Sequence, residues 1–317
     1  MVRGLGGCLP PRVVTNDALV AGGLDTSDEW VRSRTGIVER RWCGEGVSTA
    51  DLAVAAGRGA LESSGGAGPV DAVVVATTTP DRSCPGLGPE VAWRLGLDGA
   101  AGFDVSAVCS GFVYGLWVAS GLVASGARGV LVAAAERYSS ILDRTDRGTG
   151  MIFGDGAGAA LVMPGGMDEP GAVVALDAGS DGSGRDLITV PAGERFFRMQ
   201  GPSVYREAVR CMVESARRVM QLAGWAPEEL GAFVGHQANQ RILDAVSDRL
   251  GVPAGAQVGN IERVGNTAGA SIPLVMCDKA AADVEPGAPG VLTAFGGGLT
   301  WGSVALRWPD AAPLWGD

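Results

Sequence analysis

The stretch 104–112 (Asp-Val-Ser-Ala-Val-Cys-Ser-Gly-Phe) joins a predicted strand to a predicted helix and carries a cysteine at the junction. The residues up to Val105 are predicted to end a buried strand, and residues 111–125 to form an apolar helix that ends before Gly126. Cys109 therefore lies on a turn between small residues. Free backbone N–H groups at a helix start lower the pKa of a thiol and can hold an oxyanion, so this turn suits a nucleophile. A buried structural cysteine is the alternative, and the stretch alone leaves both interpretations open.

The composition is that of a globular protein with a large core. Of 317 residues, 46% are hydrophobic and 19% are charged, which disfavours disorder. The net charge of −10 argues against nucleic acid as the main partner. The first residues lack the apolar segment of a secretory signal, and no apolar run approaches the roughly 18 residues of a membrane helix. Six scattered cysteines without a CxxC pair disfavour zinc and disulfides, so we expect a cytoplasmic protein with no metal site and no membrane association.

Apolar runs of strand length alternate along the chain with stretches of helix length. Residues 72–76 form a continuous apolar run, which is typical of a central strand covered on both faces. One helix is predicted over 49–64 and another over 266–282, the second interrupted by Pro273. The alternation predicts an α/β fold with mostly parallel sheets and with helices on their faces.

The two halves of the chain share a pattern. Residues 71–79, a strand followed by a polar loop, correspond to 231–239, and the glycine-rich turn and strand at 153–162 correspond to 295–306. This pattern indicates a duplicated αβ unit. The boundary is expected at a linker rich in proline and glycine that starts at residue 164. The predicted domains are 1–164, which carries the cysteine of the junction, and 165–317.

Two further motifs carry side chains that could work with Cys109. His236 is the only histidine of the chain, and it follows a predicted buried strand in the sequence His-Gln-Ala-Asn. Asn266 belongs to the small-residue turn 265–271, which opens a predicted helix. Each motif alone is weak, because a histidine after a strand is often a structural hydrogen-bonding residue and an asparagine before a helix is often an N-cap.

Seven motifs, taken in order, carry a resemblance to one family: 25–37, 107–112, 145–148, 153–158, 235–239, 265–267 and 295–302. With them, nearly the whole chain resembles β-ketoacyl-acyl carrier protein synthase III and its relatives that prime polyketide synthesis, within the thiolase superfamily. The resemblance implies an α/β, thiolase-like fold, in which two duplicated αβ halves form a layered α-β-α-β-α architecture.

The resemblance also implies a catalytic triad of Cys109, His236 and Asn266. A thiolate suits the transfer, because it can take an acyl group from a thioester and return it to carbon. When a malonyl thioester loses CO₂, a neutral imidazole and an amide can hydrogen-bond the enolate oxygen without trapping it as a salt. The backbone N–H groups of Cys109 and Gly297 are expected to form an oxyanion hole, and a tight turn between strands is compatible with that role.

Members of the family bind acyl-CoA in a tunnel, and the resemblance implies the same substrate for this chain. For two of the matching residues, Trp30 and Arg34, an ordinary amphipathic helix edge is the alternative interpretation. Tyr205 stands where the family often has phenylalanine. The matching residues are Trp30 and Arg34 for the adenine ring, Arg147 for phosphate, and Gly201, Tyr205 and Asn239 for the pantetheine arm.

Two macromolecular partners are also implied, namely an acyl carrier protein and a second copy of the chain. In the family's dimer, a loop inserts a side chain, often phenylalanine, into the acyl pocket of the partner. The matching residue here is the much smaller Cys84, which predicts a roomier acyl pocket than acetyl requires. A local basic patch could steer the acidic carrier protein, with a solvated helix face as the alternative. The patch would consist of Arg206, Arg210, Arg217 and Arg241.

We therefore expect a condensing enzyme without a cofactor, which joins an acyl-CoA primer to malonyl-acyl carrier protein in fatty acid or polyketide chain initiation. The nearest alternative is an acyltransferase that moves the acyl group from Cys109 to an alcohol or amine. Asn266 favours condensation, because such acyltransferases tend to vary this residue. A degradative thiolase is disfavoured because the closing loop, 296–300, lacks a second cysteine. A non-enzymatic scaffold of the same fold is the remaining alternative.

Overall fold

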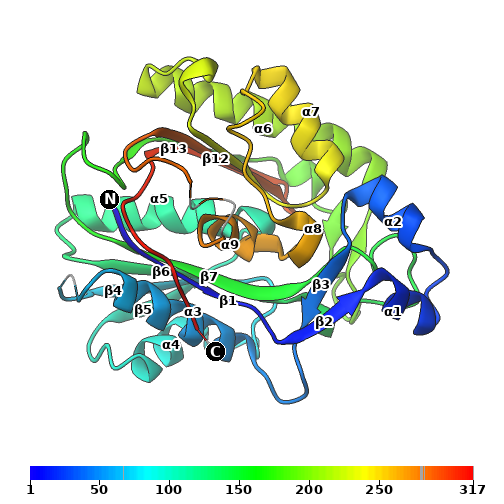
Figure 1. The fold of residues 1–317 in the computed structure, drawn as a ribbon. Helices are drawn as coiled ribbons and strands as arrows, with labels where there is room; N and C mark the ends of the chain where they lie inside the picture. Colours follow the sequence, from blue (N-terminus) through cyan, green and yellow to red (C-terminus); the bar gives the residue numbers. More distant parts are fainter. Residues whose placement is uncertain (67, 279–280, 282, 317) are drawn as a thin grey trace.

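A computed structural model describes residues 1–66, 68–278, 281 and 283–316. Its chain forms two large mixed sheets stacked with helices between and outside them (Figure 1). The first sheet contains, in spatial order, β14 (Leu314–Trp315), β1 (Val2–Cys8), β7 (Asp155–Val162), β6 (Val130–Arg137), β4 (Ala72–Ala76) and β5 (Ala101–Val105). The second contains β11 (Ala232–Gly235), β12 (Pro289–Gly296), β13 (Thr300–Arg307) and β8 (Val173–Ser180).

The helices form the other three layers. On the outer face of the first sheet lie α3 (Thr49–Ser63) and α4 (Gly88–Arg94), and on that of the second lies α6 (Gly201–Ala223) with α7 (Gln240–Leu250) beside it. The central layer contains α5 (Gly111–Ala124) and α9 (Ser271–Met276). The predicted α-β-α-β-α architecture is thereby confirmed.

The strand order supports the predicted duplication. In the first sheet the order β1-β7-β6-β4 has two antiparallel pairs and then a parallel one, and β8-β13-β12-β11 repeats that pattern in the second sheet. The sheets are therefore mixed, and the expectation of mostly parallel sheets was wrong, because antiparallel neighbours flank β7 and β13. The domain boundary near residue 164 stays a prediction, and β14 returns from the end of the chain to pair with β1.

Burial explains why the central elements form where they do. Every residue of β4 is buried, as its continuous apolar run predicted. The central helix α5 has an almost wholly apolar sequence because sheets cover it on two sides. Gly115 lets α5 approach β6 closely, since a Cβ there would lie 2.6 Å from a methyl carbon of Val132. A capping box of Ser48 and Asp51 starts α3, with each side chain accepting the backbone N–H of the other residue.

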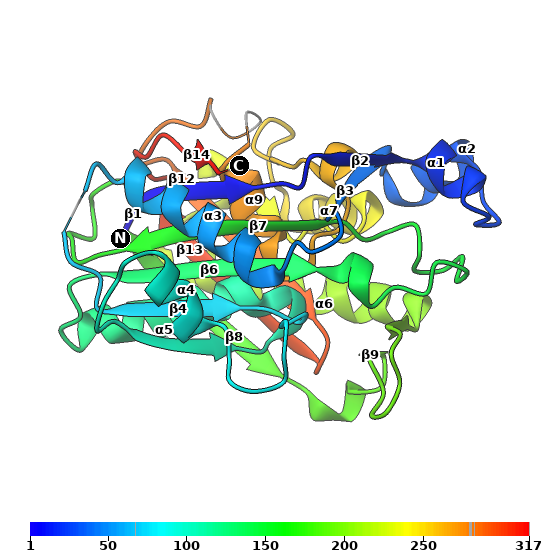
Figure 2. The same ribbon diagram turned by 90° about the horizontal axis from the view of Figure 1, so that it is seen from below.

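A smaller excursion lies beyond one end of the first sheet. It contains the hairpin of β2 (Arg12–Thr15) and β3 (Glu39–Trp42) with α1 (Asn16–Ala21) and α2 (Asp28–Thr35), and Figure 2 shows it projecting from the layered body. The remaining elements are short: β9 (Ile188–Thr189), β10 (Arg198–Met199), α8 (Ile261–Val264), and the 3-10 turns η1 (Val108–Ser110), η2 (Tyr138–Ser140), η3 (Gly182–Gly184), η4 (Pro227–Glu229) and η5 (Ala268–Ala270). Among the described residues, no helix combines the length and apolarity needed to cross a membrane.

Two element predictions differ from the structure. The strand before the cysteine, β5, is the edge strand of its sheet, and its residues are exposed or half-buried rather than buried. The helix predicted over 266–282 starts only at Ser271 and ends at Met276, with Pro273 inside its first turn, where a missing N–H costs nothing. Positions 279, 280 and 282 of that prediction lie outside the described residues.

Candidate active site

Cys109 lies in the 3-10 turn η1, directly before α5. The residue before it, Val108, has a φ of 48°, a left-handed conformation that is unfavourable for a β-branched residue. The glycine-rich segment that begins with Gly296, the last residue of β12, packs against this turn, since a Cβ at Gly296 would lie 2.7 Å from the backbone nitrogen of Cys109. The strained, closely packed turn therefore places the thiol and the adjacent backbone N–H groups at the N-terminal end of the central helix α5.

Cys109, His236 and Asn266 line one cavity, although they are far apart in the sequence. The cavity has a volume of about 30 Å³, and the other side chains around it are apolar. On one side, Phe153 stacks on the buried Tyr138 with 4.4 Å between ring centroids. The remaining lining residues are Ile188, Phe197, Met199, Val204, Ala208, Met212, Ala238, Ile242 and Phe295. The structure thus gathers the three sequence-predicted residues in a small cavity whose other lining side chains are apolar.

His236 follows β11, and contacts with neighbouring residues hold both its backbone and its imidazole ring. Its backbone N–H donates to the carbonyl of Thr293 over 2.8 Å, and its Nδ1 lies 2.7 Å from the hydroxyl oxygen of Ser271. The same hydroxyl oxygen accepts the N–H of Gln237 over 3.3 Å. Burial lowers the pKa of the imidazole to about 3, so His236 is neutral at physiological pH.

Asn266 is fixed by its backbone and by its side-chain oxygen. Its N–H donates to the carbonyl of Ile152, and its carbonyl accepts the N–H of Gly154, over 3.0 and 2.9 Å. Its Oδ1 accepts the N–H of Ala268, two residues further along the chain, over 2.8 Å. The N-cap interpretation was wrong, because Thr267 precedes η5 and Ala270 precedes α9 as the N-cap residues, and the amide N–H₂ of Asn266 is the part of the side chain left to serve the cavity.

The protonation of Cys109 differs from the expectation drawn from its place at a helix start. Burial, and secondarily the charge of Glu136, raise the pKa of the Cys109 thiol, whereas its own backbone N–H lowers that pKa by less. The expected lowering of the pKa was therefore wrong for the resting protein, because desolvation outweighs the helix start. Inside its closed chamber the thiol is protonated.

Gly297 occupies the turn between β12 and β13, one residue beyond the glycine that contacts Cys109. A Cβ at Gly297 would lie 2.9 Å from the carbonyl oxygen of Ile188, so this position also requires glycine for close packing. The hydroxyl of Thr300 lies 3.1 Å from the carbonyl oxygen of Ala107 and 3.0 Å from that of Gly297, so its single hydrogen can be donated to either one and links the turn to the cysteine segment.

The residues predicted to bind the nucleotide of CoA lie together at the projecting excursion. The guanidinium of Arg147 lies 4.5 Å and that of Arg34 5.7 Å from the ring centroid of Trp30, an arrangement of cation–π type. Asn239 caps α7, and its side-chain amide donates to the carbonyl of Arg34 over 2.9 Å. This hydrogen bond joins the predicted nucleotide-binding residues to the segment that carries His236. All four side chains therefore belong to one surface region.

The remaining predicted residues are more dispersed. Gly201 and Tyr205 lie in the first turns of α6, the helix that supplies Val204 and Ala208 to the cavity. Cys84 is exposed in the loop between β4 and α4 and does not line the cavity of its own chain. The predicted basic patch is less uniform than expected, because Arg210 forms ion pairs with Glu207 and Glu214. Of its other members, Arg206 and Arg241 are exposed and Arg217 donates to the carbonyl of Arg249.

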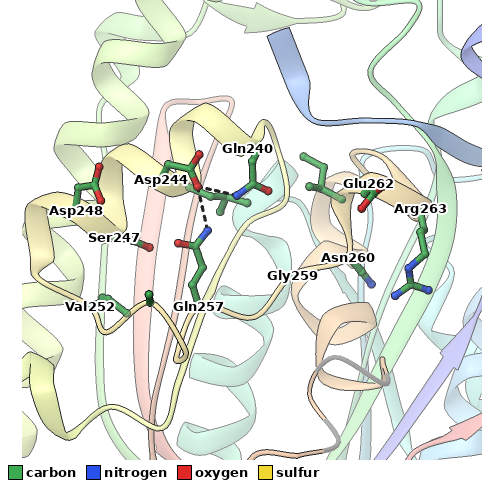
Figure 3. A pocket seen from close by; sticks show the side chains of 13 residues that line it. Gln240, Asp244, Ser247, Asp248, Val252, Gln257, Gly259, Asn260, Glu262 and Arg263 are labelled. Carbon is green, nitrogen blue, oxygen red and sulfur yellow. Dashed lines mark hydrogen bonds between the residues drawn. The ribbon is translucent and has the colours of Figure 1, made fainter. Parts of the chain in front are cut away.

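A larger surface pocket, of about 730 Å³, lies elsewhere, between α7 and the segment 252–263 (Figure 3). Its walls are polar, and Asp244 accepts hydrogen bonds there from Gln240 and Gln257. None of the three residues of the predicted triad lines it. Chemistry with a thiol, an imidazole and an amide therefore belongs to the small buried cavity and not to this groove.

Three residues around the cavity were missed by the sequence interpretation. Ser271 bonds to His236, Gln237 accepts the N–H groups of Asn260 and Ile261, and the buried Glu136 acts electrostatically on the thiol of Cys109. Gln237 and Ser271 belong to the two motifs that contain His236 and Asn266, but a sequence motif does not show which residue a side chain hydrogen-bonds. Glu136 ends an apolar run, and a carboxyl in such a place is the only signal that could have identified it.

Comparisons with known proteins agree with this geometry. Residues 103–182 match the model of the 3-oxoacyl-acyl carrier protein synthase III family, and residues 220–308 match the model of its C-terminal part. A β-ketoacyl-acyl carrier protein synthase III of Streptomyces coelicolor is 52% identical over 99% of this chain and 95% of its own length.

Solved structures show the same relationship. The 3-oxoacyl-acyl carrier protein synthase III of Pseudomonas aeruginosa superimposes with a TM-score of 0.94 at 48% identity, covering 98% of this chain and 99% of that one. The priming β-ketosynthase of a polyketide biosynthetic pathway has a TM-score of 0.90 at 38% identity, covering 98% and 96% of the two chains. This chain therefore belongs to the β-ketoacyl-acyl carrier protein synthase III family, acyltransferases of the thiolase superfamily that initiate fatty acid or polyketide chains by Claisen condensation.

Proposed function

We propose that this chain joins an acyl-CoA primer to malonyl-acyl carrier protein through an acyl group carried on Cys109, with His236 and Asn266 assisting decarboxylation. The observation that carries the proposal is the convergence of these three side chains on one buried apolar cavity. A thiol, a neutral imidazole and an amide supply a nucleophile and two hydrogen-bond donors. The reaction then draws on the chain's own side chains, with acyl-CoA as a substrate and with no resident cofactor.

In the first step, the sulfur of Cys109 attacks the thioester carbonyl of acyl-CoA. The bond between the acyl carbon and the CoA sulfur breaks, and CoA leaves with the proton of the thiol. The backbone N–H groups of Cys109 and Gly297 hold the oxyanion of the tetrahedral intermediate. The close approach of the glycine segment to the cysteine turn supports this pairing.

In the second step, malonyl-acyl carrier protein loses CO₂ and leaves an enolate. The Nε2–H of His236 and the amide N–H₂ of Asn266 donate to the enolate oxygen. The enolate carbon attacks the acyl group on Cys109, a β-ketoacyl thioester departs, and the released thiolate takes a proton. A neutral histidine suits this role, because an imidazolium would hold the enolate as an ion pair and slow its attack on carbon.

Substrate access uses the surface near the excursion. Trp30, Arg34 and Arg147 bind the nucleotide of CoA, where a guanidinium and an indole can enclose an adenine ring. The pantetheine arm passes Gly201, Tyr205 and Asn239 to reach the cavity. The acidic carrier protein docks on Arg206 and Arg241, which are exposed, as are the other two arginines of the basic patch.

We further propose a cytoplasmic homodimer. The outer edge of β5 has no partner strand among the described residues, and such an edge is normally covered by another chain or segment. In the dimer, Cys84 of one chain enters the acyl pocket of the other and leaves it wider than acetyl requires.

The proposal is tested by supplying purified protein with acyl-CoA and malonyl-acyl carrier protein and measuring CO₂ and the thioester product together. We expect CO₂ and β-ketoacyl-acyl carrier protein in equal amounts, and no β-ketoacyl product from Cys109→Ala, which cannot carry the acyl group. Transfer of the acyl group to an added alcohol or amine without CO₂ release would instead identify the alternative acyltransferase.

A further inference from the structure

Glu136 is a buried carboxyl beneath the active site that the proposed mechanism does not use. It lies near the end of β6 and is fully buried. An ionised carboxylate in such a place is costly unless it is paired. The hydroxyl and backbone N–H groups around Glu136 donate to it and favour its charged form, whereas burial, which is the larger effect, favours the neutral form.

The carboxyl joins two segments that come from different halves of the chain. From the loop after β4, the backbone N–H and the hydroxyl of Thr78 and the hydroxyl of Thr79 donate to it over 3.0–3.2 Å. From η5 in the other half, the N–H of Gly269 donates to it. A Cβ at Gly269 would lie 3.0 Å from the carbonyl of Val108 and 3.2 Å from Glu136, so η5 is packed between the carboxyl and the cysteine turn.

Glu136 and the nucleophile influence each other electrostatically. A negative charge on Glu136 raises the pKa of the Cys109 thiol, and it acts in the same direction on the phenol of Tyr138. Burial raises the pKa of Glu136 to about 8, so the group is mostly protonated at neutral pH. The β4 loop and η5 face it with uncharged Thr78, Thr79 and Gly269, and β7, the neighbouring strand, carries Asp155; the thiol of Cys109 and the phenol of Tyr138 are titratable groups on which its charge acts.

We propose that Glu136 is a positioning residue for Cys109: its uncharged carboxyl joins the active-site turns of both halves, and its ionisation opposes formation of the thiolate. The inference rests on the proposed role of Cys109 as nucleophile. The reactivity of the Cys109 thiol then depends on pH through two ionisations, that of the thiol itself and that of Glu136.

The test is the rate at which iodoacetamide alkylates Cys109 as a function of pH, followed by peptide mass spectrometry. In the wild-type protein, the rate should rise about tenfold per pH unit at first and then less steeply above about pH 8, as Glu136 ionises. In Glu136→Gln the alkylation rate should keep its steep rise at all these pH values. It should match the wild-type rate near pH 6.5 and exceed it roughly tenfold near pH 9.5, which corresponds to an interaction between Glu136 and Cys109 of about one pKa unit.

Matched measurements separate this effect from a general loss of structure. Asp155 is a buried carboxyl on the neighbouring strand that bonds Ser139 and Cys43, and Asp155→Asn should leave the profile of Cys109 unchanged. Thr78→Val keeps Glu136 but removes one hydroxyl donor, which should move the break in the profile to higher pH. Alkylation of the exposed Cys84 in the same samples serves as the internal reference, and it should not differ between the variants.

Identical profiles in wild type and Glu136→Gln would overturn the inference. If that variant does not fold, a wild-type profile that keeps its full slope from pH 7 to about 9.5 would overturn it equally. Alkylation needs neither CoA nor carrier protein, so this outcome would leave the proposed condensation untouched. Conversely, failure of Cys109 to accept an acyl group would contradict the proposed function whatever the alkylation profile shows.

Discussion

The imidazole Nδ1 of His236 and the hydroxyl oxygen of Ser271 are 2.7 Å apart in the interior of the protein. The serine oxygen also accepts the N–H of Gln237, and its single hydrogen can be donated to Nδ1. A Ser271 hydroxyl that donates to Nδ1 places the imidazole hydrogen on Nε2, which is the tautomer that the proposed mechanism requires for donation to an enolate oxygen.

Replacing Ser271 by alanine should slow decarboxylation about tenfold, the effect of one lost hydrogen bond of roughly 1.4 kcal/mol. CO₂ release from malonyl-acyl carrier protein by the acylated enzyme measures this step. Ser215→Ala is the matched control, since Ser215 is a buried serine that bonds Asp177 away from the cavity. Equal rates in Ser271→Ala and the control would exclude the assigned role.

The neutrality of His236 predicts an unusual independence of pH. The pKa of this group is about 3 in the fold and about 6.5 in an unfolded chain, so decarboxylation should change less than about twofold between pH 5.5 and 7.5. A tenfold fall per pH unit below about 6.5 would show that the imidazole titrates normally.

The same group also links stability to pH. Between the folded and unfolded pKa values the unfolded chain binds the extra proton, so the free energy of unfolding falls as the pH drops below about 6.5. The contribution of His236 should approach about 1.4 kcal/mol per pH unit. Denaturant titrations of wild type and His236→Gln at several pH values measure it, and parallel pH dependences would contradict the assignment.

Asn266→Asp should separate the two steps of the reaction. A carboxylate beside the developing enolate would repel its charge, so decarboxylation should fall roughly 10²–10³-fold. Acylation of Cys109 by acyl-CoA precedes the enolate and should proceed at nearly the wild-type rate. Stopped samples weighed as intact protein give the acylation rate, and CO₂ release gives the second step. A similar loss in both would refute the division of roles.

Cys84 should govern the length of the primer. In the proposed dimer the wild-type protein should use acyl-CoA primers longer than acetyl-CoA, and Cys84→Phe should shift kcat/KM towards acetyl-CoA by about tenfold or more, since each methylene is worth a factor of that order. Cys84→Ser is the size-matched control and should keep the wild-type preference. Strict use of acetyl-CoA by the wild-type protein would contradict a roomier pocket.

Local patterns predicted much of this molecule. The apolar helix expected after Cys109 forms as α5, and the buried run at 72–76 forms as β4, because apolar sequence and burial coincide there. The triad positions, which the family resemblance implied, also converge on one cavity. These features depend on motifs and on short-range periodicity, which a sequence displays directly.

Features set by distant contacts were not predictable in the same way. The pKa of Cys109 depends on burial between sheets and on Glu136, and the partner of His236 comes from a turn 35 residues away. The helix expected from Asn266 starts later because its backbone first bridges to Ile152 and Gly154. In each case a local preference is outweighed by a partner that only the fold brings near.

The most direct test of the account is the intact mass of the protein after incubation with a mixed pool of acyl-CoA thioesters, without carrier protein. We expect the mass to increase by one acyl group, with the modification located on the peptide that contains Cys109 and absent from Cys109→Ala. An unchanged mass, or an acyl group on a different cysteine, would contradict the role of Cys109 on which the proposed mechanism depends.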